Sequence, residues 1–146
     1  MSADPADTRG ALKRPAGDGR TAIGMPIEPD GLHDVLIRLT RDYTNLPLYI
    51  TESGAAFHDY VDPEGKVDDV ERIAYLDAHV RAAARAIADG VELRGYYVWS
   101  LLDNFEWQDG YSQRFGLVYV DYRTQTRIPK ASARWYSGVI SANELP

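Results

Sequence analysis

The chain has 146 residues and a formal net charge of −6, which suits one domain of ordinary size. Acidic and basic residues are mixed along the sequence without a basic stripe, which argues against a nucleic-acid partner. The absence of cysteine excludes disulfides and thiolate metal sites and fits a reducing compartment. No apolar run approaches the roughly 18 to 20 residues of a membrane span, and no secretory signal follows Met1, so we expect a cytoplasmic protein without a membrane partner.

The first stretch, residues 1–20, is rich in small, charged and proline residues, and Leu12 is almost its only bulky apolar side chain. Such a segment cannot bury enough surface to offset the entropy lost on ordering. We therefore expect residues 1–20 to form a disordered tail and residues 21–146 to form the folded part.

The first helix is indicated by Asp30, a suitable N-cap after Pro29, and by the apolar residues that follow at helical spacing. These apolar residues are Leu32, Val35, Leu36, Leu39 and Tyr43. Asn45 and Pro47 end the helix, and the apolar run 48–51 then predicts a short strand.

The second helix has the clearest signals. Asp68 followed by Glu71 resembles a capping box, which explains the acids here as charges at a helix start, and Gly90 is a natural residue after the helix end. The expected apolar stripe consists of Val70, Ile73, Leu76, Val80, Ala83, Ala84 and Ile87. A helix of this length between two short apolar strands, 48–51 and 95–99, predicts a right-handed βαβ crossover.

The remaining chain predicts a hairpin, 116–121 and 126–128 around a turn at 122–125, and a short helix over 132–141. In that helix we expect Tyr136, Val139 and Ile140 to point inward. Only two parallel strands are predicted, and a sheet of two strands has unpaired edges and little surface to pack against. The chain is therefore expected to be part of a larger fold.

Polar and aromatic residues follow abruptly on both apolar strands. The first strand leads to Glu52, and the second leads to Trp99, Asp103 and Glu106. The carboxyl ends of buried parallel strands open into a site in many α/β proteins. Indole rings suit the apolar faces of sugars, and carboxylates accept hydrogen bonds from sugar hydroxyls. The pattern favours sugar chemistry, with Asp103 in a structural turn.

Four strings carry a resemblance to a known family: LYITESGAAF, VDDVERIAYLDAHV, GYYVWSLLDNFEWQDGYSQRFGLVYVDY and RIPKASARWY. In this order and spacing they resemble the C-terminal part of glycoside hydrolase family 1, the β-glucosidase and β-galactosidase family. The resemblance implies an α/β fold: the C-terminal portion of a (β/α)8 TIM barrel, consisting of the last two βα units plus a β-hairpin. Tyr96 and Tyr97 would then face opposite sides of the sheet, one of them toward the barrel interior.

The resemblance also implies roles for individual residues. Glu52 matches the catalytic nucleophile, Glu106 and Trp107 match residues that bond the hydroxyls of the nonreducing sugar, and Trp99 matches the platform under its ring. Phe115 would lie near the hydroxymethyl side. The implied activity is retaining hydrolysis of terminal β-linked sugars, with a β-glycoside or oligosaccharide as substrate and no metal or other cofactor.

The sequence also departs from the family pattern. Ser53 stands where asparagine is usual, and Met25 stands where tryptophan is more common. The acid/base glutamate of an Asn-Glu-Pro motif, an early Gln and His, and a Tyr that orients the nucleophile have no counterpart. Retaining hydrolysis needs two carboxyl groups roughly 5 to 5.5 Å apart, so the chain alone is expected to be inactive. A complementary N-terminal chain is one candidate partner.

Several alternatives stay open. A non-catalytic carbohydrate-binding or vestigial protein would use the aromatic residues alone, and several copies could together rebuild a barrel. Glu106 could pair with Arg114, and Phe105 is interpreted as a core aromatic residue. The histidines share no metal-ligand spacing and are expected on surfaces or helix faces: His33, His58 and His79.

Overall fold

The computed structural model describes residues 19–43 and 45–146, so most of the expected tail lies outside the described residues. The described elements, in order, are α2 (Pro29–Asp42), β1 (Leu48–Ser53), α3 (Val70–Ala88), β2 (Leu93–Val98), β3 (Val118–Val120), β4 (Arg127–Pro129) and α4 (Ala131–Ala142). This order confirms the predicted sequence of helices and strands, with boundaries that differ by a few residues.

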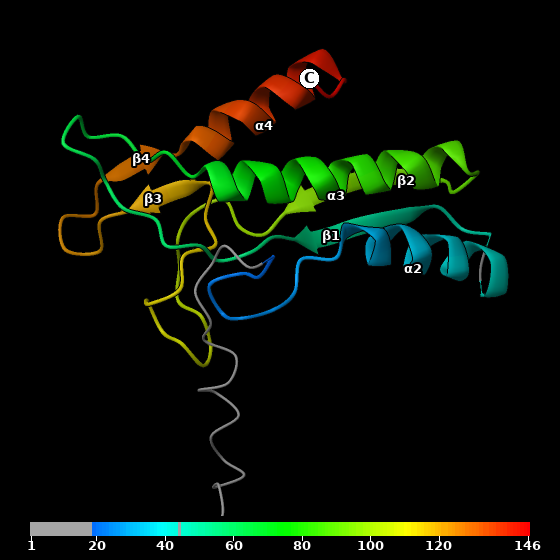
Figure 1. Ribbon diagram of the computed structural model, residues 1–146, viewed down its shortest axis with the longest axis horizontal. Helices are drawn as coiled ribbons and strands as arrows, with labels where there is room; N and C mark the ends of the chain where they lie inside the picture. Colours follow the sequence, from blue (N-terminus) through cyan, green and yellow to red (C-terminus); the bar gives the residue numbers. More distant parts are fainter. Residues whose placement is uncertain (1–18, 44) are drawn as a thin grey trace, which may run out of the picture.

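The strands form two small sheets. β1 and β2 pair in parallel, with Ile50 opposite Tyr96 and Ser53 opposite Val98, and α3 connects them. Figure 1 shows α3 running along this pair, which confirms the parallel βαβ arrangement. β3 and β4 pair in antiparallel fashion, which confirms the hairpin. Its turn is held by Asp121, whose Oδ1 accepts a hydrogen bond from Arg123 N at 2.9 Å.

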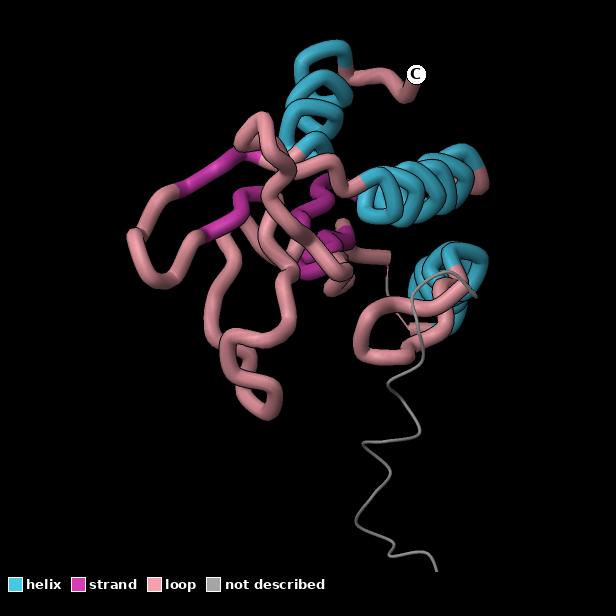
Figure 2. Tube along the Cα trace, turned by 60° about the vertical axis from the view of Figure 1, so that its left-hand side comes forward, coloured by secondary structure: helices cyan, strands magenta, loops and turns pink. Residues whose placement is uncertain are grey.

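The core lies between the parallel strands and the two helices α2 and α3. In Figure 2 these helices lie on one side of the strands, and loops occupy the other. The buried cluster consists of Leu36, Ile50, Ala83, Ala86 and Val91, with Tyr96 packed against it. Ile50 alternates in β1 with exposed neighbours, as expected for a strand with one covered face.

No described element covers the opposite face of the parallel pair. Tyr49 is 53% exposed and Tyr97 is 58% exposed, while the Tyr49 ring lies against Gly95. The predicted alternation of Tyr96 and Tyr97 is therefore confirmed. Parallel sheets are normally covered on both faces, whereas the face that carries Tyr49 and Tyr97 is exposed here.

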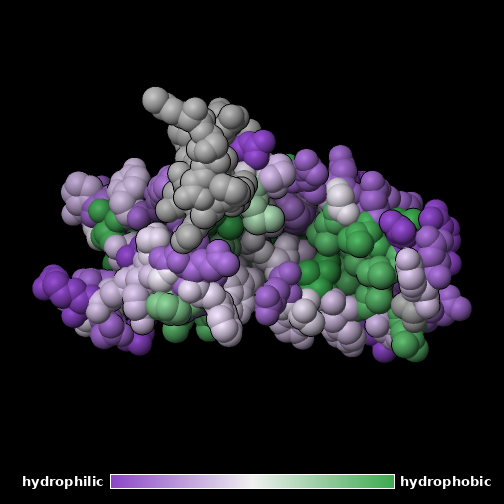
Figure 3. All heavy atoms as spheres, turned by 90° about the horizontal axis from the view of Figure 1, so that it is seen from below, coloured by the Kyte–Doolittle hydropathy of each residue, from purple (hydrophilic) through white to green (hydrophobic). Residues whose placement is uncertain are grey.

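The predicted N-cap of α2 is wrong, whereas Leu32 and Leu36 of its predicted apolar residues contact the core. The helix begins at Pro29 rather than after Asp30, and among its apolar residues only Leu36 is buried. Val35 and Leu39 are exposed. Figure 3 shows a hydrophobic surface area on the half of the molecule that carries α2.

The start and the buried face of α3 also differ from expectation. The N-cap is Asp69, not Asp68, and it makes no side-chain capping bond because it is used in a buried ion pair with Arg72. The apolar stripe is rotated, so that Val70 and Ile87 are exposed while Arg72 is buried. Gly90 has φ of +99°, which confirms its place beyond the helix end.

His79 lies on a face of α3, one of the two kinds of position expected for the histidines, and it is the buried face. Its ring stacks on Tyr75 with centroids 3.9 Å apart, and its Nδ1 lies 2.7 Å from the Tyr75 carbonyl oxygen. Burial lowers the pKa of His79. The histidine is therefore a neutral packing residue whose polar edge is satisfied by its own helix.

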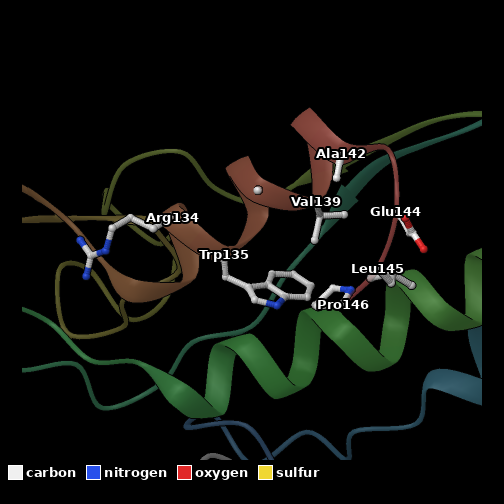
Figure 4. A pocket seen from close by; sticks show the side chains of 8 residues that line it. Arg134, Trp135, Val139, Ala142, Glu144, Leu145 and Pro146 are labelled. Carbon is white, nitrogen blue, oxygen red and sulfur yellow. The ribbon is translucent and has the colours of Figure 1, made fainter.

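The last helix, α4, leaves a hollow against the C-terminal residues. Figure 4 shows Trp135 and Val139 from α4 facing Leu145 and Pro146 above α3, around a cavity of about 560 Å³. Ile140 is 62% exposed, so its predicted inward position is wrong. None of the residues predicted to act on a sugar lines this hollow.

Candidate active site

The site begins where the two parallel strands end. β1 and β2 run in the same direction. Glu52, near the end of β1, and Trp99, just after β2, therefore lie at the same C-terminal end of the sheet. The backbone N–H of Trp99 donates a hydrogen bond to the Ser53 carbonyl oxygen at 3.0 Å. The side chain of Glu52 is exposed at this end. The expected nucleophile and the expected sugar platform are therefore neighbours.

Gly54 allows this close approach. A Cβ atom at position 54 would lie 1.7 Å from the Trp99 carbonyl oxygen and 2.8 Å from its carbonyl carbon. No side chain can fit there, so the glycine after Glu52-Ser53 lets the two strand-end loops touch through their backbones.

Glu106 is held beside the indole of Trp99. The Trp99 Nε1–H donates to Glu106 Oε1 at 3.3 Å. A tight turn fixes this position, because Glu106 N donates to Gly110 O at 2.8 Å and Gly110 N donates to Glu106 O at 2.7 Å. Arg114 pairs with Asp103 at 2.5 Å, so the alternative in which Glu106 pairs with Arg114 is wrong.

The other aromatic residues of this loop are arranged differently. Trp107 is 93% exposed at the tip of the turn, and Phe105 is 57% exposed, so the interpretation of Phe105 as a core residue is wrong for this chain. Phe115 is half-buried, and its carbonyl oxygen accepts a hydrogen bond from Ser100 N at 3.2 Å. The structure thus gathers Glu52, Trp99 and Glu106, while Trp107 projects from the same loop.

Ser53 is anchored from behind the sheet. The Tyr96 hydroxyl donates to Ser53 Oγ at 2.8 Å, and the Tyr136 hydroxyl of α4 donates to the Tyr96 carbonyl oxygen at 2.9 Å. Burial raises the pKa of Tyr96, so its phenol stays protonated and can donate this bond. This hydrogen bond therefore holds Ser53, the residue after Glu52, in place. Nothing in the sequence pattern indicated this contact.

A model of the family described as "Glycosyl hydrolase family 1" matches residues 6–145. The chain belongs to this family.

Family members with curated names show how much of a complete protein this chain represents. The 1,4-beta-D-glucan glucohydrolase of Thermotoga neapolitana is 56% identical over 126 residues, which are 86% of this chain and 28% of that protein. Beta-glucosidase A of Thermotoga maritima is 54% identical over 126 residues, which are again 86% of this chain and 28% of that protein. The solved structure of the family 1 β-glucosidase of Thermotoga maritima superposes on this chain with a TM-score of 0.86. The superposed part is 87% of this chain and 29% of the β-glucosidase.

The chain therefore spans less than a third of the length of these relatives. Its small sheets and helices correspond to part of the family 1 β-glucosidase fold, which agrees with the uncovered strand face described above.

No group of three or more potential metal-ligating side chains comes together among residues 19–43 and 45–146. Within the same residues, no helix has the length and apolar character needed to cross a membrane.

Sequence reasoning missed most of the ionic contacts beneath the site. Asp103 is expected in a structural turn, and it is buried there, accepting a hydrogen bond from Gly116 N at 2.9 Å. Its partner Lys130 stands just before α4, far along the chain. A lysine before a helix is ordinarily solvated, so no local signal could have identified its burial.

Proposed function

We propose that this chain carries the nucleophile side of a retaining β-glycosidase that removes terminal β-linked sugars, and that it forms the last two βα units of a (β/α)8 barrel. The observation that supports this proposal is the placement of Glu52 beside Trp99, whose indole is bonded to Glu106 at the same end of the sheet. Membership of family 1 and the β-glucosidase names of its relatives support the choice of reaction.

In this reaction the Glu52 carboxylate attacks the anomeric carbon, and the bond from that carbon to the leaving oxygen breaks. The resulting ester between Glu52 and the sugar is then hydrolysed by water. Trp99 would lie under the sugar ring, Glu106 and Trp107 would bond its hydroxyls, and Phe115 would lie near its hydroxymethyl group.

The proton donor would come from outside these 146 residues. The sequence contains no Asn-Glu-Pro string, and Glu106 accepts a hydrogen bond from Trp99 instead of standing free as an acid. Departure of an alkoxide without protonation is slow, and general acid catalysis contributes typically about 10² to 10⁴ in rate. We therefore expect little hydrolysis of ordinary glycosides by this chain alone.

The remainder of a barrel is the partner that this chain fits. The Tyr49 and Tyr97 face of the sheet is exposed, although parallel sheets are normally covered on both faces. The outer edges of β1 and β2 pair with no other described strand. A complementary N-terminal segment, in the same or another polypeptide, would cover this face and supply the second carboxyl group.

A reconstitution experiment tests the proposal. The chain is mixed with the part of Thermotoga maritima beta-glucosidase A that it does not match, and hydrolysis of an aryl β-glucoside is measured. We expect activity above that of either piece, and none with Glu52→Gln. Complex formation without hydrolysis would contradict the proposed nucleophile side.

Carbohydrate binding without hydrolysis is a second candidate function, and the almost fully exposed Trp107 favours it. This alternative predicts binding of a glucose-like ligand such as deoxynojirimycin that is lost in Trp107→Ala, with no hydrolysis in the reconstituted assembly. Calorimetric titration together with the activity assay separates the two candidates.

A further inference from the structure

A buried ionic cluster lies beneath the two loops that carry the site. Its side chains are at most 2% exposed, apart from one arginine that is 17% exposed. Three acids face three bases, so the charges balance. The members are Asp59, Asp69, Asp103, Arg72, Arg114 and Lys130.

Lys130 joins a carboxylate of one site loop to a carboxylate of the other. Its Nζ lies 2.5 Å from Asp59 Oδ2 and 2.9 Å from Asp103 Oδ1, and its side chain is 0% exposed. Asp59 belongs to the loop that follows Glu52 and β1. Asp103 lies between Trp99 and Glu106 in the loop that follows β2. One ammonium group therefore connects the loop of the expected nucleophile to the loop of the sugar platform.

Asp103 transmits this connection to the rest of its loop. Its carboxylate also accepts hydrogen bonds from Gly116 N at 2.9 Å and from Arg114 Nη1 at 2.5 Å. A Cβ at Gly116 would lie 2.2 Å from Asp103 N, so the two ends of the loop are packed backbone to backbone. Arg114 in turn lies 3.9 Å over the Tyr119 ring of the hairpin.

Asp59 and Asp103 each have a second basic partner besides Lys130. Asp59 Oδ2 also receives a hydrogen bond from Arg72 at 2.7 Å, and Asp103 keeps Arg114. Buried ion pairs often stabilise a fold no more than apolar residues of the same shape. Other contacts also join the two loops: Arg72 Nη2 lies 2.7 Å from Asp59 Oδ2 and donates to the Arg114 carbonyl oxygen at 2.8 Å, and Phe57 N donates to the same oxygen at 3.4 Å. Among the described ion pairs, Lys130 is the basic residue that pairs with both Asp59 and Asp103, so it links the two loops through their carboxylates.

We propose that Lys130 is a positioning residue for the glycosidase site, which sets the place of the sugar-binding loop 99–116 relative to Glu52 by bridging Asp59 and Asp103. This inference rests on the proposed function for its meaning in catalysis. The geometric part concerns only this chain, so it can be tested without sugar and without hydrolysis.

The experiment follows the indole N–H signal of Trp99 by NMR in the ¹⁵N-labelled chain, assigned with Trp99→Phe. Lys130→Met removes the ammonium group and keeps a chain of similar length. Lys66→Met is the matched control, because Lys66 is exposed and its ammonium group pairs with the nearby Glu64 at 2.7 Å. The double variant Lys130→Met with Asp59→Asn restores the charge balance but not the bridge.

We expect Lys130→Met to move the Trp99 signal and to speed its exchange with water at least tenfold, with no change in Lys66→Met. The double variant should regain stability in urea but keep the altered Trp99 signal, and it carries the test if the single variant unfolds. An unchanged Trp99 signal in Lys130→Met, or a normal signal in the double variant, would overturn the proposal. Failure of reconstitution with normal NMR behaviour would instead count against the proposed function.

Discussion

Replacing Gly54 with alanine should break the contact on which the site is built. The new Cβ would lie 1.7 Å from the Trp99 carbonyl oxygen, whereas ordinary contact begins near 3.4 Å. Neither backbone can move freely, because Trp99 N is bonded to Ser53 O at 3.0 Å. Overpacking costs about 1–3 kcal/mol where side chains can adjust, and losing that hydrogen bond adds about 1 kcal/mol. We expect a loss of about 2–4 kcal/mol in the free energy of unfolding.

Gly138 provides a matched control for the same chemical change. It lies in α4, and apart from the backbone of its own helix and its chain neighbours no heavy atom of the described residues lies within 4 Å of the place that its Cβ would take. Gly138→Ala should therefore stabilise the chain by about 1 kcal/mol through helix propensity. Urea unfolding of both variants, followed by circular dichroism, measures the difference. A Gly54→Ala variant within about 1 kcal/mol of the parent chain would refute the backbone contact.

Three further outcomes follow from buried polar groups. Tyr96→Phe removes the bond to Ser53 Oγ and should lower the free energy of unfolding by about 1 kcal/mol, measured in urea. Arg72→Met leaves buried carboxylates without their guanidinium and should cost about 3–5 kcal/mol; a loss below 1 kcal/mol would contradict this ion pairing. Because burial lowers the pKa of His79, its contribution to stability is complete above the unfolded value near 6.5 and is lost as the pH falls through the lowered folded value. His79→Gln should therefore flatten the dependence of stability on pH below about pH 6.5, whereas His33→Gln should not remove this dependence.

The order of elements and the meeting of the two strand ends could be predicted because both depend on local patterns. Short apolar runs that end in Glu52 and Trp99 indicate parallel strands with polar carboxyl ends. Gly90 indicates a helix end because its φ of +99° favours glycine. These signals are carried by neighbouring residues, so they can be read without knowledge of the tertiary contacts.

The ionic contacts could not be predicted, because they join residues far apart in the sequence. The sequence indicates only a charge at a helix start for Asp69, yet its Oδ1 accepts a hydrogen bond from Ser132 N at 2.8 Å, at the start of α4. Arg72 and Lys130 are residue types that are rarely buried, and only their partners in space stabilise them there.

The buried faces were predicted incompletely for a different reason. An apolar residue such as Val35 or Ile87 indicates a face that some partner covers, but it does not say whether that partner belongs to the same stretch of chain. This chain spans less than a third of the length of its relatives. The apolar face of a helix can therefore extend beyond the residues that pack in the described core.

Covalent labelling of Glu52 tests the central claim most directly. The reconstituted assembly is incubated with a fluoro-glucoside that carries a dinitrophenolate leaving group, which departs without needing a proton donor. Nucleophilic attack then leaves the fluoro-sugar bound to the enzyme as an ester and releases one equivalent of dinitrophenolate. We predict that peptide mass spectrometry finds the sugar on Glu52, with no label in Glu52→Gln. A label on another carboxylate, or an assembly that hydrolyses glucosides with Glu52 unlabelled, would contradict the assignment.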